Sequence, residues 1–156
     1  SGPTGRRDWP CQRWSNRETE YSEMLQEHYD LKNVKALRNA TSYNHCILNG
    51  FTKAEAPADY STPQVIMDSL NAAGMSRTKA RSAKLSNLRI AQMVVTLYCL
   101  GVLGTNESAM SRHGKRFANI RKKYEAKMER YRLNSSFVSF FDFLLKLVDI
   151  WVSTGA

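Results

Sequence analysis

The chain has 156 residues, of which 42% are hydrophobic and 10% aromatic, and its 23 basic and 14 acidic side chains give a net charge of +9. A chain of this length can bury a substantial core as one domain, and its hydrophobic content excludes a wholly disordered protein. Four prolines and eight glycines are too few for an all-β fold of many tight turns. We therefore expect an all-α protein, an irregular bundle of five or six helices with a non-helical N-terminal arm.

The predicted arm covers residues 1–15, which contain prolines and glycines and show no helical period. A single helical domain is then expected over residues 16–156. The arm carries Trp9 and Trp14, and both indole rings need a surface to cover them. They either pack back on the domain or dock on a neighbouring molecule, and the sequence leaves both possibilities open.

The first helix is predicted over residues 17–30, because Asn16 is a good N-cap and apolar residues then recur at steps of three and four. The pattern continues toward Gly50 as one bent helix or as two. Residues 51–61 contain a proline and have no period, so they are predicted to form a loop.

The next helix is predicted over residues 63–73, since Thr62-Pro63 is a typical helix start and Gly74 stands where a helix stop belongs. Its predicted inward positions are Val65, Ile66, Leu70 and Ala73. Ser76 is then expected to cap one long helix that runs to Leu103, basic in its first half and almost wholly apolar in its second.

Apolar residues in the following segment step by three and four, which predicts a helix that begins at residue 107 or 111 and ends at 133. The predicted core stripe of this helix is Phe117, Ile120, Tyr124, Met128 and Tyr131. The bases fall on its back and on one flank, whereas Glu125 and Glu129 fall on the other flank. Sorting by sign is unusual for a solvated helix, where opposite charges usually alternate.

The last helix is predicted from Ser135 to Val152, with Asn134 as the stop residue before it. Its polar stripe consists only of Asp142, Lys146 and Asp149, so its apolar face is unusually wide. Such a helix either lies deep in the bundle or mediates self-association with Trp151 as an anchor. The apolar runs over residues 90–103 and 137–152 are shorter than the roughly 20 residues that a membrane span needs.

Positive charge is concentrated in one segment of the chain. Fourteen of the 23 bases fall between Arg77 and Arg132 with only three acids, a net charge of +11, while the remainder carries nine bases and eleven acids. A polyanion is the partner that such a segment favours, and nucleic acid is the commonest one.

Residues 63–84 also have the pattern of a helix-turn-helix motif, with a short helix, a glycine turn and a basic second helix. In this interpretation Ala80 and Ala83 face the first helix, and the side chains that enter the major groove of DNA are Arg77, Thr78, Lys79 and Arg81. The long second helix argues against it.

No motif for an enzyme is present. The histidines His28, His45 and His113 are scattered, and the sequence contains no glycine-rich phosphate loop and no metal-ligand spacing. We therefore expect neither catalysis nor a metal or cofactor site.

The leading hypothesis is a non-enzymatic RNA- or DNA-binding protein of nucleoprotein or coat type that contacts the phosphate backbone and forms a homo-oligomer, in an intracellular or virion-associated location. The predicted nucleic-acid-binding residues are Arg77, Lys79, Arg81, Lys84, Arg112, Lys115, Arg116, Lys122, Lys123, Lys127 and Arg130. The predicted oligomer-interface residues are Trp9, Trp14, Phe141 and Trp151. A helix-turn-helix DNA-binding regulator is one alternative.

The other alternative is a secreted basic helical bundle that recognises a receptor, an acidic glycan or a membrane surface. Glycosylation sequons begin at Asn39, Asn106 and Asn134. Of the three cysteines, Cys99 lies in an apolar run where a buried, inert thiol is expected. Only Cys11 and Cys46 are therefore candidates for a disulfide, and the sequence does not decide whether they pair.

Overall fold

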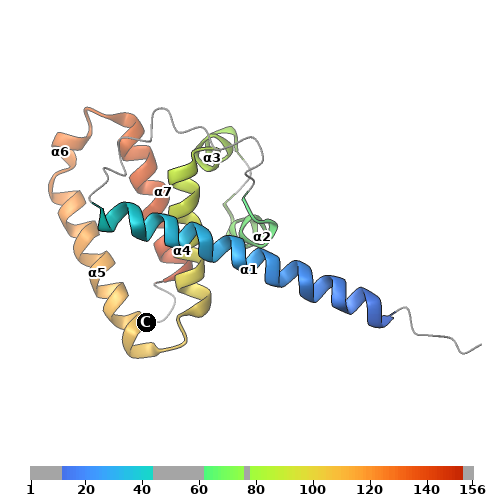
Figure 1. Ribbon diagram of the computed structural model, residues 1–156. Coiled ribbons are helices and arrows are strands. Elements are labelled where there is room, and N and C mark those ends of the chain that lie inside the picture. The colour runs from blue at the N-terminus through green and yellow to red at the C-terminus, as the bar shows by residue number, and fades with distance from the viewer. Residues whose placement is uncertain (1–11, 44–61, 76–77, 153–156) are drawn as a thin grey trace, which may run out of the picture.

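The computed structural model describes residues 12–43, 62–75 and 78–152 (Figure 1). All regular structure in these ranges is helical, which confirms the predicted all-α bundle. The helices are α1 (Gln12–Ser42), α2 (Gln64–Ala72), α3 (Lys79–Leu85), α4 (Leu88–Leu103), α5 (Glu107–Ala126), α6 (Met128–Tyr131) and α7 (Ser135–Trp151). None of these helices is both long enough and apolar enough to cross a membrane.

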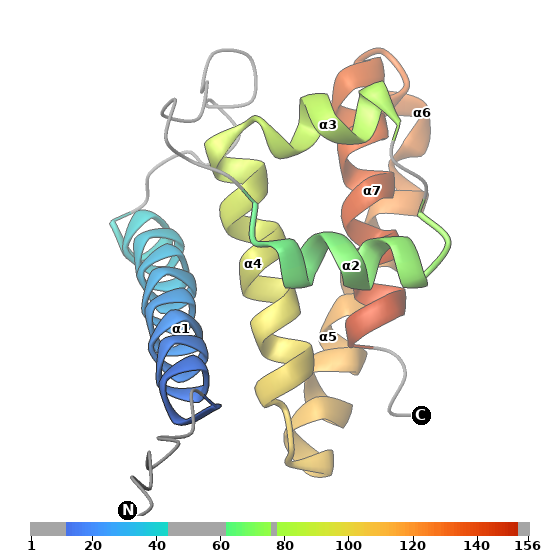
Figure 2. The same ribbon diagram turned by 90° about the vertical axis from the view of Figure 1, so that its right-hand side faces the viewer.

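The core lies between α4 and α7, the two most apolar helices of the described chain. Val94 and Val95 of α4 are fully buried, as is Leu147 of α7. In Figure 2, α2 lies across both helices, and its Ile66 and Leu70 complete the core with no exposed surface. The predicted deep position of the last helix is therefore what the structure shows.

Close contact between α4 and α7 depends on a glycine. A Cβ atom added at Gly101 would lie 2.5 Å from the carbonyl oxygen of Trp151 and 2.9 Å from its Cβ atom. Only a residue without a side chain fits this approach of the two backbones.

Trp151 lies inside the molecule, so its predicted role as a surface anchor for self-association is wrong. Its side chain is 9% exposed, and its indole Nε1 donates a hydrogen bond to the hydroxyl oxygen of Ser69 at 2.9 Å. Its ring also meets the ring of Tyr98 edge to face, with the centroids 5.4 Å apart. Trp151 thus joins α7 to both α2 and α4.

The first helix begins earlier than predicted and continues beyond residue 30 as one helix, which is one of the two possibilities that the sequence left open. α1 is one helix of 31 residues that packs on α4, and it begins at Gln12, so residues 12–15 are helical and not part of an arm. Residues 1–11, with Trp9 and Cys11, and residues 44–61, with Cys46 and the predicted loop, lie outside the described residues.

The predicted helix over residues 76–103 is instead two helices. Ser86 ends α3, and Asn87 takes an extended conformation and caps α4 by accepting hydrogen bonds from the backbone N–H groups of Arg89 and Ile90. Asparagine favours this role because its short side chain competes for backbone donors. A second break, at Lys127, separates α5 from α6 within the segment that was predicted as one helix.

Three predicted inward positions are exposed. Val65 is 47% and Ile120 43% exposed, and Ala73 also faces solvent. Val65 and Ile120 lie at the edges of their apolar stripes on a helical wheel. Ala73 lies in the middle of its stripe but follows the last residue of α2.

Candidate nucleic-acid interface

The candidate interface is the outer surface of α5 and α6. Asn106 starts α5 by accepting a hydrogen bond from the backbone N–H of Ala109 at 2.9 Å. Aromatic rings then hold α5 and α6 on α7. Tyr124 stacks on Phe141 and on Tyr131, with ring centroids 4.5 Å and 5.7 Å apart. The ring centroids of Tyr131 and Phe137 are 4.9 Å apart. This cluster fixes which side of α5 faces solvent.

Phe141 takes part in this cluster. Its ring is half-buried against Tyr124 and Phe137 of the same chain, so part of its surface is covered within the chain, and its place at an oligomer interface stays a prediction. Trp14 belongs to α1, and Trp9 lies outside the described residues.

Tyr124 anchors the cluster. It is 4% exposed, and its hydroxyl donates a hydrogen bond to Asp142 of α7 at 3.0 Å. Burial, together with the hydrogen bond and the negative charge of Asp142, raises the pKa of Tyr124 to about 12. The phenol therefore stays protonated, and donating, at any physiological pH.

All seven predicted bases of α5 and α6 point to solvent: Arg112, Lys115, Arg116, Lys122, Lys123, Lys127 and Arg130 are exposed. We call these seven residues the basic face. Within the described ranges, the two ion pairs use other bases, Arg121 with Asp149 at 2.5 Å and Arg132 with Glu129 at 3.1 Å. Within these ranges, no ion pair neutralises the positive charge of the basic face.

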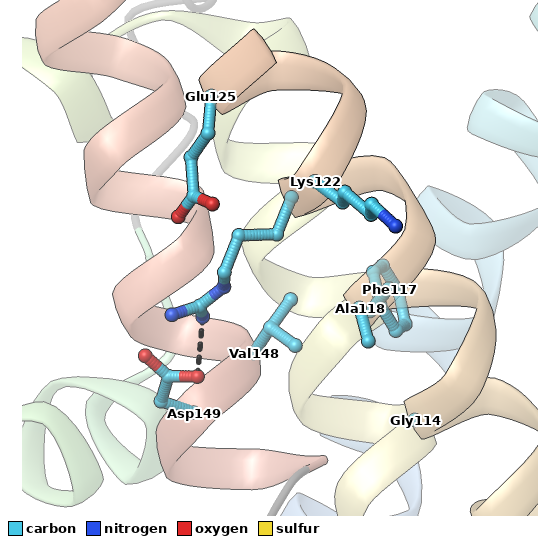
Figure 3. Close-up of a pocket in the computed structure, with 8 residues that line it drawn as sticks. Gly114, Phe117, Ala118, Lys122, Glu125, Val148 and Asp149 are labelled. Carbon is cyan, nitrogen blue, oxygen red and sulfur yellow. Dashed lines mark hydrogen bonds and ion pairs between the residues drawn. The ribbon is translucent and has the colours of Figure 1, made fainter.

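Acidic side chains border a different side of α5. A pocket of about 260 Å³ lies between α5 and α7, with Gly114, Phe117, Ala118 and Val148 in its lining and the Arg121–Asp149 pair across it. Figure 3 shows Glu125 and Asp149 on the α7 side of this pocket and Lys122 pointing away from both. The predicted sorting of bases from acids is thus present in space.

The second predicted group of bases does not form a comparable surface. Arg81 is 4% exposed, and its Nη1 donates hydrogen bonds to Asn71 Oδ1 at 3.0 Å and to the carbonyl oxygen of Met75. It therefore holds the corner between α2 and α3 and cannot contact a nucleic acid, which corrects its predicted role. Its Nε and Nη2 atoms are buried and have no hydrogen-bond partner among the residues that the structure describes.

The remaining bases of this group differ in exposure. Lys79 is exposed, whereas Lys84 is half-buried with its Nζ atom 5.4 Å from the ring centroid of Phe143. Arg77 lies outside the described residues. Ala80 and Ala83 are exposed and do not face α2, so the packing expected of a helix-turn-helix motif is not observed.

The remaining candidate sites are metal-ligand clusters, the thiol of Cys99 and the glycosylation sequons. Within residues 12–43, 62–75 and 78–152, no group of three or more histidine, cysteine or acidic side chains is placed to hold a metal ion. Cys99 is a free thiol, and burial raises its pKa, which makes it a poor nucleophile. The sequon residues Asn106 and Asn134 are exposed and cap α5 and α7 through their Oδ1 atoms.

Comparison with other proteins finds no matching protein family, curated protein or solved structure.

Proposed function

We propose that this protein binds nucleic acid, without catalysis, through electrostatic contacts between the basic face and backbone phosphates. The observation that carries the proposal is the exposure of seven bases along α5 and α6, none of which joins an ion pair within the described ranges. Like charges on neighbouring turns of a helix repel one another. A polyanion that lies along the helix attracts each of these bases and so offsets the repulsion between them.

The length of the surface suits a nucleic-acid backbone. From Arg112 to Ala126 the helix rises about 21 Å, at roughly 1.5 Å per residue. Duplex DNA carries one negative charge per about 1.7 Å of its axis, so several phosphates lie within reach of the basic face. Seven such contacts predict a salt dependence with a slope of about −6 in a plot of log affinity against log salt concentration, from roughly −0.9 per contact.

The aromatic residues favour contacts to the backbone over contacts to bases. Tyr124, Tyr131, Phe137 and Phe141 stack on one another inside the chain, and Phe117 packs against the core. Base stacking needs exposed rings, and sequence readout needs side chains that reach base edges. We therefore expect binding that depends little on nucleotide sequence.

The test reverses the charge of three adjacent bases. Lys122→Glu, Lys123→Glu and Lys127→Glu combined should abolish detectable binding and leave the far-UV circular dichroism spectrum unchanged, because all three side chains are exposed. Fluorescence anisotropy of labelled single-stranded RNA, single-stranded DNA and duplex DNA measures the affinity.

The matched control replaces the same three lysines by arginine. This variant keeps the charge and should retain affinity within about threefold, because phosphate contacts at an exposed face depend mainly on charge. If the glutamate variant binds as tightly as the wild type, the basic face is not the interface.

A further inference from the structure

The inward side of α1 is polar near the middle of the helix and apolar toward its C-terminus, where Val34 and Leu37 are half-buried and Ala40 is buried. Figure 1 shows the N-terminal half of α1 extending beyond the other helices, while its C-terminal half crosses α4. The side chains that α1 turns inward include Gln26 and Asp30, and Asp30 is only 8% exposed. Gln26 Nε2 donates a hydrogen bond to Asp30 Oδ1 at 2.9 Å. A polar stripe thus faces the bundle near the middle of α1.

Apolar side chains occupy the outward face of the same helix. Met24 is 68% exposed, Leu31 57%, Tyr29 55% and Leu25 38%. Met24, His28, Leu31 and Lys35 follow one another at steps of four, three and four, which is the spacing of a helix seam that packs against a second helix. The described chain supplies no helix to cover this seam.

The charges of α1 are divided along its length. Among the side chains of α1 that the structure describes, Glu20, Glu23 and Glu27 lie before the centre of this outward face, and Lys32, Lys35 and Arg38 lie after it; all six are exposed. The first half of α1 also contains Arg13 and Arg17 in its sequence. None of the six takes part in the ion pairs found in the described ranges. Each group has like charges three or four residues apart, which repel one another on an isolated helix.

We propose that a second copy of this chain covers the outward face, with the two α1 helices antiparallel about a two-fold axis near His28. This arrangement sets Leu25 opposite Leu31 of the partner subunit. It also places the acidic half of each helix beside the basic half of the other. Attraction between the two helices then offsets the repulsion between like charges within each helix.

Self-complementarity is the reason to choose a second copy as the partner. An interface with two-fold symmetry requires one patch to match itself after a half-turn. The apolar patch, the acidic group and the basic group of α1 are arranged about the same residue, so a half-turn exchanges the two charge groups and leaves the apolar patch in place. This interface uses no residue of the basic face and does not depend on the proposed function.

The first experiment is sedimentation velocity over a series of protein concentrations in the absence of nucleic acid. The wild type should shift from monomer to dimer as concentration rises. Met24→Glu and Leu31→Glu should each weaken the dimer about tenfold or more, because a charge then replaces an apolar side chain at the centre of the seam. Leu133→Glu is the matched control, since Leu133 is 91% exposed and lies between α6 and α7, outside α1, so its replacement should leave the dimer unchanged.

The second experiment tests the antiparallel arrangement with two charge variants. One carries Glu20→Lys, Glu23→Lys and Glu27→Lys, and the other carries Lys32→Glu, Lys35→Glu and Arg38→Glu. Each variant alone should be monomeric, because both halves of its α1 then carry the same sign. An equimolar mixture should form a one-to-one dimer with wild-type affinity or better.

Two results would overturn the proposal. A wild-type chain that stays monomeric at every concentration excludes the dimer. Self-association of the second variant at wild-type strength would show that the acidic half of α1 meets another surface, such as α5, and not the basic half of a second α1. Circular dichroism and thermal unfolding of each variant establish that it is folded.

Discussion

At the scale of single residues, the fold places ionisable groups where burial decides their chemistry. Burial raises the pKa of Asp30 and of Tyr98, which lie where α1 meets α4. Tyr124 experiences the same effect where α5 meets α7, with the added contribution of Asp142. Among the bases, Arg81 is also buried, and its guanidinium donates a hydrogen bond to Asn71 at the corner between α2 and α3 instead of reaching the surface.

The raised pKa of Tyr124 predicts a specific dependence of stability on pH. The pKa rises from the ordinary value of 10.0 to about 12 in the folded chain, so the folded state holds this proton more tightly than the unfolded state does. The stabilisation is complete below pH 10 and decreases as the pH rises from 10 toward 12.

Tyr124→Phe should remove this contribution. At neutral pH the variant should lose about 1 kcal/mol of unfolding free energy, the usual net value of one hydrogen bond. Above about pH 10 the difference between variant and wild type should shrink. Urea unfolding of both proteins from about pH 7 to about pH 11 measures it, and a difference that is constant over this range would contradict the assignment.

At the scale of helices, the sequence predicted the boundaries that a local signal marks better than the length or the exposed side of an element. Asn134 and Gly74 mark real boundaries because capping and positive φ are local properties: Gly74 has φ of 76°, and Asn134 caps α7. The breaks at Asn87 and Lys127 were missed because apolar spacing continues across each of them. The inward side of α1 could be predicted only in part: Leu37 and Ala40 lie inward as their apolar character suggests, whereas Asp30 is buried and Met24 and Leu31 are exposed.

The contact between α4 and α7 gives a prediction at this scale. Gly101→Ala should destabilise the protein by about 1–3 kcal/mol, because the added methyl group cannot fit against the Trp151 backbone without moving one helix. Thermal unfolding should show a decrease in Tm of roughly 2–4 °C for each kcal/mol.

Gly114→Ala provides the control for this substitution. Nothing lies within 4 Å of a Cβ atom built at Gly114, which is also in a helix. Alanine should therefore stabilise α5 by about 0.5–1 kcal/mol through its higher helix propensity. If both variants lose stability equally, the close approach of α4 and α7 is not what requires Gly101.

At the scale of the whole molecule, a rigid α4–α7 core carries two outer surfaces on different helices. The all-α class could be predicted from composition and helical period. The exposure of the seven bases of α5 and α6 could be predicted as well, because the apolar stripe of the same segment determines which side faces solvent. The separate positions of α3 and α5 could not be predicted, because they depend on how α4 and α7 pack. For the same reason, burial of Arg81 and Trp151 could be recognised only in three dimensions.

The measurement that tests the central claim most directly is the affinity of the wild-type protein for single-stranded RNA and for duplex DNA at several salt concentrations. The account predicts a linear fall of log affinity with log salt concentration. Its slope should approach about −6 for the duplex and about −5 for the single strand if all seven bases contact phosphates. Absence of binding at low salt, or an affinity that does not change with salt, would contradict the assignment of the basic face as a phosphate-binding surface.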